Sequence, residues 1–286
     1  MSKGGLINFY DLKAIKEMKD ETYNPHFDDT NIEIPSRICI VGASGSGKST
    51  CLMNFILKAK STFGHITIVT KQQEPLYDYL EKQLKGKNIT IHYDLSKLEE
   101  PKDFPNKELQ NLLIFDDQIA EKNQRKIVEY FIRGRKIGAG ITCCYLSQSY
   151  YQVPKTIRAQ LSYIWLVKIG QKRDLNLILA DSGGLVDKKT LMHLYEDATQ
   201  QKFNFLKINL NTVDMNRKFS KNLTDFIYWT EKSKKKKRNK SLTEFIFCSF
   251  SKNKTNNKKT KQNNKSNKKC LVPQKVPKKP KSLWRV

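Results

Sequence analysis

The stretch Gly42-Ala43-Ser44-Gly45-Ser46-Gly47-Lys48-Ser49 decides the fold of this 286-residue chain. It follows an apolar run at residues 37–41 and precedes an amphipathic segment at residues 49–60. The spacing is a full match to the phosphate-binding pattern G-x-x-x-x-G-K-[ST]. If the match were a chance Gly/Ser-rich turn, a strand before it and a helix after it would not be expected. The stretch therefore predicts a nucleotide-binding loop that joins a β-strand to an α-helix.

Each residue type in this loop has a role in holding phosphate. Glycines let the backbone pass close to an anion, and the first turn of the following helix offers free N–H groups and a positive dipole end. We expect Lys48 to contact the β- and γ-phosphates and the Ser49 hydroxyl to bind Mg²⁺, with Thr50 a poorer-placed substitute. The residues expected to bind ATP are Gly42, Ala43, Ser44, Gly45, Ser46, Gly47, Lys48, Ser49 and Thr50.

Around the loop, strand-like and helix-like segments alternate. The expected strands are residues 37–41, 66–69, 89–93, 112–115, 141–146, 163–169 and 203–210, and the clearest helices are residues 49–60, 76–84, 122–133 and 175–179. Such alternation is typical of an α/β fold with a mostly parallel central sheet flanked by helices.

Two acids follow the fourth expected strand. Asp116 and Asp117 end an apolar run without alternation, which indicates a central strand buried on both faces. The carboxyl end of such a strand lies beside the phosphate loop in open α/β sheets. We expect Asp116 to hold the Mg²⁺ shell and Asp117 to orient or deprotonate the attacking water.

A polar residue and a basic turn flank the next expected strand. Gln148 follows residues 141–146 and could hydrogen-bond both the γ-phosphate and the lytic water, or it could simply satisfy loop backbone. Before the strand, Arg135 is the candidate for an arginine finger that reaches a neighbouring subunit's γ-phosphate, with Arg133 as the second choice. A basic surface patch is the competing interpretation of these arginines.

Charge is concentrated at one end of the chain. Residues 231–286 hold 20 Lys and Arg against two acids, Glu231 and Glu244, which accounts for +18 of the formal net charge of +25. We divide the chain into an N-terminal extension (residues 1–30), a P-loop ATPase domain (residues 31–230) and a Lys/Asn-rich tail (residues 231–286) expected to be disordered. The tail could bind duplex DNA through counterion release, could be a solvated segment, or could carry a nuclear import signal at residues 234–238.

Several function classes are excluded or disfavoured by composition. No run approaches the roughly 18 apolar residues of a membrane span, so no integral membrane span is expected. The six cysteines have neither zinc-binding nor disulfide-framework spacing and are interpreted as reduced thiols. The four histidines are scattered without metal-ligand spacing.

Taken together, the phosphate loop, the strand that ends in Asp116-Asp117, Arg135-Lys136-x-Gly138 and Leu146-Ser147-Gln148-Ser149 resemble a known family. The chain is similar to the genome-packaging ATPases of large nucleocytoplasmic DNA viruses and their virophage or polinton-like relatives, within the FtsK/HerA group. The segments at residues 74–77 and 153–158 also match. Asp117 departs from the family's usual Glu by one methylene, and the tail is outside the family's motifs.

This resemblance implies a RecA-like P-loop fold in which the strand before Gln148 lies between the loop strand and the Asp116 strand. It implies an ATPase that assembles as a ring, usually a hexamer, and drives double-stranded DNA into a preformed capsid. The implied cofactors are ATP and Mg²⁺, and the implied partners are DNA, further copies of the chain, and capsid or vertex proteins. The implied location is the host cytoplasm, in the viral factory, or the virion.

Two other functions stay open on the residues alone. A P-loop kinase for a nucleoside or another small hydroxyl compound would share the loop and could use either aspartate, but it has no evident use for Gln148. A non-hydrolysing nucleotide switch that organises assembly is the third possibility, with Asp117 too short to activate water.

Overall fold

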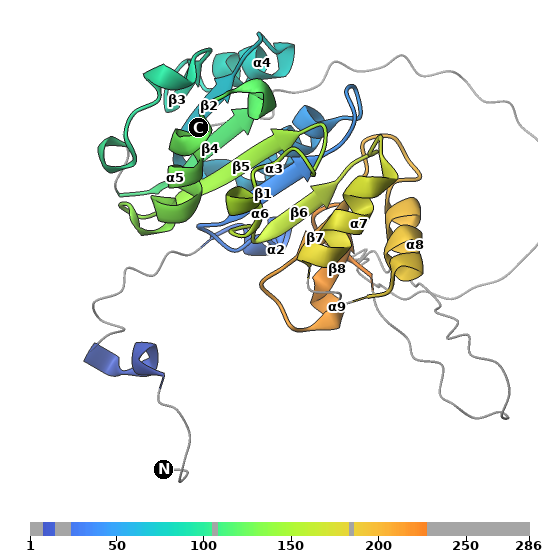
Figure 1. The fold of residues 1–286 in the computed structure, drawn as a ribbon. Helices are drawn as coiled ribbons and strands as arrows, with labels where there is room; N and C mark the ends of the chain where they lie inside the picture. Colours follow the sequence, from blue (N-terminus) through green and yellow to red (C-terminus); the bar gives the residue numbers. More distant parts are fainter. Residues whose placement is uncertain (1–7, 15–23, 105–107, 183–185, 228–286) are drawn as a thin grey trace, which may run out of the picture. The chain divides into compact units, whose positions relative to one another are not determined.

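The computed structural model describes residues 8–14, 24–104, 108–182 and 186–227 (Figure 1). The predicted tail, residues 231–286, lies outside the described residues, as do Cys248 and Cys270. The described part of the chain forms one sheet with helices on both faces. The predicted α/β class, with a mostly parallel central sheet flanked by helices, is therefore confirmed.

The sheet has nine strands in the described residues, in the order β3-β2-β4-β5-β1-β6-β7-β8-β9. Their bounds are β1 (Arg37–Val41), β2 (Phe63–Thr70), β3 (Ile89–His92), β4 (Gln110–Asp116), β5 (Ile141–Ser147), β6 (Tyr163–Leu166), β7 (Leu206–Asn209), β8 (Phe219–Lys221) and β9 (Asp225–Phe226). From β3 to β6 all pairings are parallel, and from β6 to β9 they are antiparallel. The predicted position of β5 between β1 and β4 is confirmed.

The central strands are mostly apolar because both of their faces are covered. Every residue of β1 and β5 is buried. On one face, alternate residues of β1, β4, β5 and β6 form a core with α5, α6, α7 and α8. On the other face, Phe55 of α3 packs edge-on against Trp165 of β6 and Phe63 of β2, with ring centroids 5.6 Å and 5.9 Å apart.

The helices of these two layers have the following bounds. They are α2 (Phe27–Thr30), α3 (Lys48–Ala59), α4 (Pro75–Gln83), α5 (Arg125–Arg133), α6 (Lys155–Arg158), α7 (Lys172–Asp181), α8 (Lys188–Ala198) and α9 (Met215–Lys218). Single turns of 3₁₀-helix are η1 (Phe9–Asp11), η2 (Lys60–Thr62), η3 (Leu95–Lys97), η4 (Pro101–Asp103), η5 (Gln118–Ala120) and η6 (Gly134–Lys136).

Some elements differ from the expected ranges for local reasons. β7 begins at Leu206 instead of residue 203 because Phe203 has a left-handed backbone, with φ of 71°, which no strand accommodates. β6 ends at Leu166 because the carbonyl of Lys168 turns to the phosphate loop instead of to a strand. α8 was not predicted, although Asp187 caps it by accepting hydrogen bonds from two backbone N–H groups.

The residues before β1 pack against the domain instead of forming a separate extension as far as residue 30. Asn24 is buried, donates hydrogen bonds to Thr30 and to the carbonyl of Ile32, and accepts one from Thr62 at 3.3 Å. Because Thr62 lies in η2, the turn that follows α3, these contacts join the two segments across a sequence separation of 38 residues. The folded domain therefore starts earlier than the predicted boundary at residue 31.

Two further findings concern the described residues. Helices of this part of the chain are all too short or too polar to cross a membrane. Cys39, Cys51, Cys143 and Cys144 are buried free thiols.

Lys207 of β7 is a buried lysine in the antiparallel part of the sheet. Its exposed fraction is 2%, and its Nζ donates hydrogen bonds to the carbonyl of Asn31, at 3.1 Å, and to that of Leu223. Burial, with a smaller contribution from the charge of Lys58, lowers the pKa of Lys207 to about 7. An amine that is neutral above this pH still supplies the two donors that the carbonyls need.

We predict that Lys207→Met removes part of the pH dependence of stability. Between pH 7 and about pH 10 the unfolded chain holds a proton on Lys207 that the folded chain lacks, so this residue makes the free energy of unfolding rise with pH, by up to about 1.4 kcal/mol per pH unit. Urea unfolding at pH 7, 8 and 9 measures the free energy of unfolding of the parent and of the variant. The contributions of other titrating groups cancel in the difference between the two. A difference that stays constant with pH contradicts the prediction.

Candidate nucleotide-binding site

The predicted phosphate loop lies at the carboxyl end of β1, held between the two neighbouring strands. The N–H of Gly42 donates to the carbonyl of Ser147 at 3.1 Å, and the N–H of Ala43 donates to the carbonyl of Lys168 at 2.8 Å. An added Cβ at Gly42 would lie 2.5 Å from Oγ of Ser46 and 3.0 Å from Cβ of Val167. Glycine is required at position 42 because the loop leaves no space for a side chain.

The end of the loop has backbone conformations that favour glycine. Gly45 and Gly47 have φ values of 69° and 104°. Gly47 is the N-cap of α3, and its carbonyl accepts a hydrogen bond from the N–H of Cys51 at 2.9 Å. The N–H groups of the first turn of α3, which have no carbonyl partner within a helix, therefore border the loop. They are the donors that an anion at this position needs.

Lys48 reaches back over the loop that precedes it. Its Nζ donates to the carbonyls of Gly42, at 2.9 Å, and of Ala43, at 3.2 Å. Burial lowers the pKa of Lys48, while the negative charges of Asp116, Asp117 and Glu74 act in the opposite direction. The ammonium is thus partly buried among carboxylates and already faces the concave side of the loop.

Asp116, the last residue of β4, is held by a tyrosine from α4. Oη of Tyr77, whose side chain is buried, donates to Oδ2 of Asp116 at 2.7 Å. Burial raises the pKa of Asp116, and the hydrogen bond from Tyr77 and the charge of Lys48 oppose that increase. Burial raises the pKa of the Tyr77 phenol, and a hydrogen bond with the Ser49 hydroxyl opposes that increase. Ser49 and Asp116, both predicted Mg²⁺ ligands, therefore meet at one hydroxyl group.

Asp117 lies outside the sheet at a sharp turn. Its backbone is left-handed, with φ of 52°, and its side chain is exposed. The next residue, Gln118, is fully buried and its Nε2 donates to the carbonyls of Asp116, at 2.9 Å, and Val69, at 3.4 Å. This amide fastens the turn to the end of β2, so it fixes where Asp117 leaves the strand.

Gln148 follows β5 with its side chain exposed, while the serines on both sides are buried. Oγ of Ser147 donates to the carbonyl of Ser149 at 2.6 Å. Oδ1 of Asp174, from α7, accepts hydrogen bonds from Oγ of Ser149 and from the N–H of Tyr151, both at 3.0 Å. The loop around Gln148 is therefore held rigidly from α7, and Gln148 itself projects from it into solvent.

Arg135 lies at the other end of the sheet from the loop. It follows α5, in η6, next to Arg37, the first residue of β1. Arg37 is buried, its Nε donates to the carbonyl of Phe131 at 2.6 Å, and its pKa is lowered by burial and then by the charge of Arg135. Because β1 rises by roughly 13 Å between its ends, Arg135 cannot reach the phosphate loop of its own chain.

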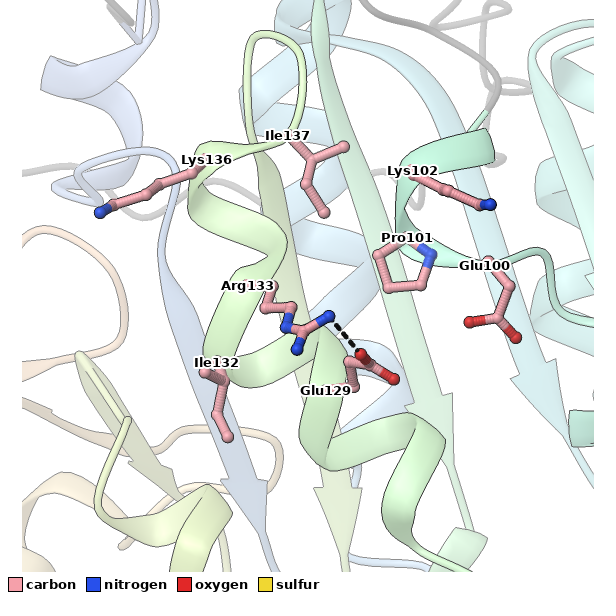
Figure 2. Close-up of a pocket in the computed structure, with 8 residues that line it drawn as sticks. All are labelled: Glu100, Pro101, Lys102, Glu129, Ile132, Arg133, Lys136 and Ile137. Carbon is pink, nitrogen blue, oxygen red and sulfur yellow. Dashed lines mark ion pairs between the residues drawn. The ribbon is translucent and has the colours of Figure 1, made fainter.

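Arg133 lies at the same end but is already paired. Its Nη1 lies 2.7 Å from Oε1 of Glu129, one turn earlier in α5 (Figure 2). Both residues line a groove of about 680 Å³ between α5 and η4. The groove lies at the end of the sheet opposite the phosphate loop, and no glycine of the described residues lines it, so it is not the nucleotide site. Arg135 has no ion pair within the described part of the chain.

The structure thus brings together the loop, Ser49, Asp116 and Asp117, with Gln148 at the end of the neighbouring strand β5, and it separates Arg135 from them. Sequence reasoning missed Tyr77 and Gln118 as residues that hold the aspartates. Tyr77 follows β2 in the sequence, and β2 is a neighbour of β4 in the sheet. Contact between Tyr77 and the end of β4 could therefore have been suspected. Gln118 had no signal beyond its position next to the acid pair.

The residues of the site fit a magnesium nucleotide. Oγ of Ser46 is buried within the loop without a hydrogen-bond partner, although a bound phosphate would supply an acceptor for it. Ser49 and Asp116 provide hard oxygen ligands, and Mg²⁺ typically takes only one or two from the protein and the rest from phosphates and water. Among the described residues there is no cluster of three or more His, Cys, Asp and Glu side chains that could hold a metal alone.

Comparison with known proteins gives one family match. The sequence model of the family described as "Poxvirus A32 protein" matches residues 25–259. No curated protein sequence matches the chain significantly.

Several solved structures are distantly similar. The genome packaging NTPase B204 from Sulfolobus turreted icosahedral virus 2, in complex with ATP-gammaS, has 15% sequence identity and a TM-score of 0.47, over 67% of this chain and 98% of that chain. The cytoplasmic domain of the type VII secretion ATPase EccC from Thermomonospora curvata has 10% identity and a TM-score of 0.45, over 67% of this chain and 25% of that chain.

We predict that Gly47→Ala destabilises the protein more than Gly45→Ala. Both positions have positive φ, which costs an alanine about 1–2 kcal/mol. Only at Gly47 would the added Cβ collide with a side chain, the ring of Phe203, whereas the space at Gly45 is open. Urea unfolding measures both costs, and we expect the excess at Gly47 to shrink in a Phe203→Ala background. Equal costs, or an excess unchanged in that background, would contradict contact between the loop and this ring.

Proposed function

The chain belongs to the poxvirus A32 protein family, and on that premise we propose that it is an ATP-driven translocase that packages double-stranded viral DNA into a preformed capsid. Membership confirms the predicted resemblance to the packaging ATPases of large nucleocytoplasmic DNA viruses. The observation that carries the enzymatic part of the proposal is the convergence of Lys48, Ser49 and Asp116 at the carboxyl ends of β1 and β4.

Binding of ATP uses the loop backbone and Lys48. The free N–H groups of the first turn of α3 and the ammonium of Lys48 surround the β- and γ-phosphates, which replace the loop carbonyls as acceptors for that ammonium. Ser49 and Asp116 would hold Mg²⁺, which neutralises charge on the same phosphates when bound. Tyr77 keeps the Asp116 carboxylate oriented, because its hydroxyl donates to one carboxylate oxygen and leaves the other available.

Hydrolysis uses two side chains that border the γ-phosphate position. Asp117 accepts a proton from a water whose oxygen attacks the γ-phosphorus, the bond to the β-phosphate oxygen breaks, and ADP and inorganic phosphate result. Gln148 donates and accepts hydrogen bonds that place this water in line with the leaving group. Since the loop around Gln148 is fastened to α7 through Asp174, loss of the γ-phosphate can be transmitted to that helix.

Completion of the site requires a second copy of the chain. Arg135 cannot reach its own phosphate loop, but at the opposite end of the sheet it is exposed, and in this proposal it enters the site of a neighbour. An arginine at the γ-phosphate stabilises the charge of the transition state by factors on the order of 10³ to 10⁵ in rate. We therefore propose a closed ring, with a hexamer as the expected size.

The remaining partners follow from the same proposal. DNA passes along the ring without sequence readout, because a pump must bind every phosphate in turn. Capsid or vertex proteins dock the ring at the portal, and the reaction takes place in the cytoplasmic viral factory of the host. The Lys-rich tail, residues 231–286, adds a non-specific contact to DNA in this proposal.

We predict that the protein hydrolyses ATP and that long duplex DNA increases the rate. Lys48→Ala should lower turnover by roughly 10²-fold or more with an unchanged far-ultraviolet circular dichroism spectrum, because the charge that binds the β- and γ-phosphates is lost. Steady-state release of phosphate, with and without DNA, measures both effects.

Other outcomes of this assay select the alternatives. Transfer of phosphate to a nucleoside, without stimulation by DNA, would identify a small-molecule kinase. Nucleotide binding without turnover, even with DNA present, would identify an assembly switch. Turnover by Lys48→Ala at the parental rate would show that the phosphate loop has been misassigned.

We further predict complementation between two inactive variants. A ring of Arg135→Ala and Lys48→Ala subunits contains interfaces in which one chain supplies Lys48 and its neighbour supplies Arg135. Equal mixing by random assembly should restore up to about one quarter of the parental turnover, because both intact groups then meet at that fraction of interfaces. Co-expression with two affinity tags and phosphate release measure the recovery.

Arg133→Ala serves as the matched control in these mixtures. Since Arg133 is engaged by Glu129, we expect its alanine variant to keep most of its turnover. An Arg133→Ala variant that is inactive by itself and regains turnover when mixed with Lys48→Ala would instead move the finger to Arg133. Absence of recovery with either variant, at every mixing ratio, would argue against catalysis between subunits.

A further inference from the structure

Phe203, in the loop before β7, lies against the phosphate loop although it is far from it in sequence. The ring is so close to Gly47 that an added Cβ there would collide with Cδ1 and lie 3.2 Å from Cε1. The carbonyl of Phe203 accepts a hydrogen bond from the thiol of Cys51, in the first turn of α3, at 3.4 Å. Backbone and ring are thus both anchored at the start of the phosphate-binding helix.

This position is maintained at a cost in backbone conformation. The φ of Phe203 is 71°, and a bulky side chain in the left-handed region is uncommon because its Cβ crowds the backbone. Such outliers cluster at functional sites, where the surrounding structure enforces them.

The ring of Phe203 is also exposed, although an aromatic ring only two residues later is buried. Phe203 has an exposed fraction of 45%, whereas Phe205, two residues later, is 3% exposed and stacks on Trp165 with ring centroids 5.0 Å apart. The Nζ of Lys202 lies 4.9 Å from the centroid of the Phe203 ring. Lys202 is exposed, so the face of the ring that it covers borders solvent, and a flat ligand can take the place of the lysine.

The sheet order determines which part of a nucleotide would meet this ring. Asp116 and Gln148, at the ends of β4 and β5, lie on one side of β1, and in the proposed function the γ-phosphate would lie toward them. The other end of the nucleotide must therefore extend to the opposite side, over β6 and β7. Phe203 lies three residues before β7 and borders the loop on that side.

We propose that Phe203 is the stacking surface for the nucleobase of the bound triphosphate. This inference rests on the proposed function, because it takes the phosphate loop to hold a nucleotide. A phenyl ring supplies area and a π-face but no hydrogen bonds, so it selects for a flat base without reading its edge. Purines, with the larger face, bind more tightly than pyrimidines, and adenine and guanine are discriminated weakly by this contact.

The test compares a ligand that has a base with one that has only phosphates. Isothermal titration of the full chain with ADP and with inorganic pyrophosphate, both with Mg²⁺, gives the two dissociation constants for the parent, Phe203→Leu and Phe203→Tyr. Leucine keeps apolar bulk over Gly47 but loses the flat face, whereas tyrosine keeps the face. We expect Phe203→Leu to weaken ADP roughly tenfold and pyrophosphate less than about twofold, and Phe203→Tyr to bind ADP within about twofold of the parent.

The outcomes separate this inference from the proposed function. Unchanged ADP affinity in Phe203→Leu overturns the stacking role, and equal losses for ADP and pyrophosphate show that the ring only supports the loop. If the affinities of the parent and its variants for ADP follow the expected pattern but the parent never hydrolyses ATP, the stacking role stands and the proposed function fails.

A second variant keeps the test decisive if Phe203→Leu does not fold. In Phe203→Trp the added indole should be quenched by ADP but not by pyrophosphate, measured as the difference from the parent, which has three tryptophans of its own. An indole whose emission does not respond to saturating ADP overturns the proposal.

Discussion

Three carboxylates, those of Asp116, Asp117 and Glu74, lie near the partly buried ammonium of Lys48, and this concentration of charge is the constraint on which the site depends. A partly buried ammonium is tolerated only where acceptors and opposite charges compensate for lost hydration. The loop carbonyls and the acids do so here. The same arrangement requires that the ends of three separate strands meet, and parallel packing of β1, β2 and β4 provides that meeting point.

The aspartate that would contact magnesium is controlled by residues that perform no chemistry themselves. Tyr77 fixes the Asp116 carboxylate from α4, and Gln118 fixes the backbone turn that carries Asp117. Asp174 does the same for the loop around Gln148 from α7. Each of these partners is buried, so each hydrogen bond is shielded from competition by water and holds the groups that it joins in one orientation.

The sheet also divides the site into two sides with different chemistry. The strands on one side of β1 end in acids and amides that suit the terminal phosphate and the water. The strands on the other side bring an aromatic ring, Phe203, which suits a base. Arg135, the proposed finger, lies on neither side of the site, because helix α5 carries the chain to the opposite end of the sheet. In the proposed function, one chain holds the nucleotide but lacks one charge, which Arg135 of a neighbouring chain would supply.

The sequence by itself determined the phosphate loop, the acid pair, the α/β class and most strand positions. These depend on local patterns: glycine spacing, an apolar run that ends in carboxylates, and alternation of segments. The resemblance added the order of β1, β5 and β4. Tertiary structure alone decided that Tyr77 holds Asp116, that Arg135 is remote from its own loop, and that Phe203 touches Gly47 across a separation of more than 150 residues. Such contacts depend on how strands pair and where helices return, and no local pattern of residues encodes them.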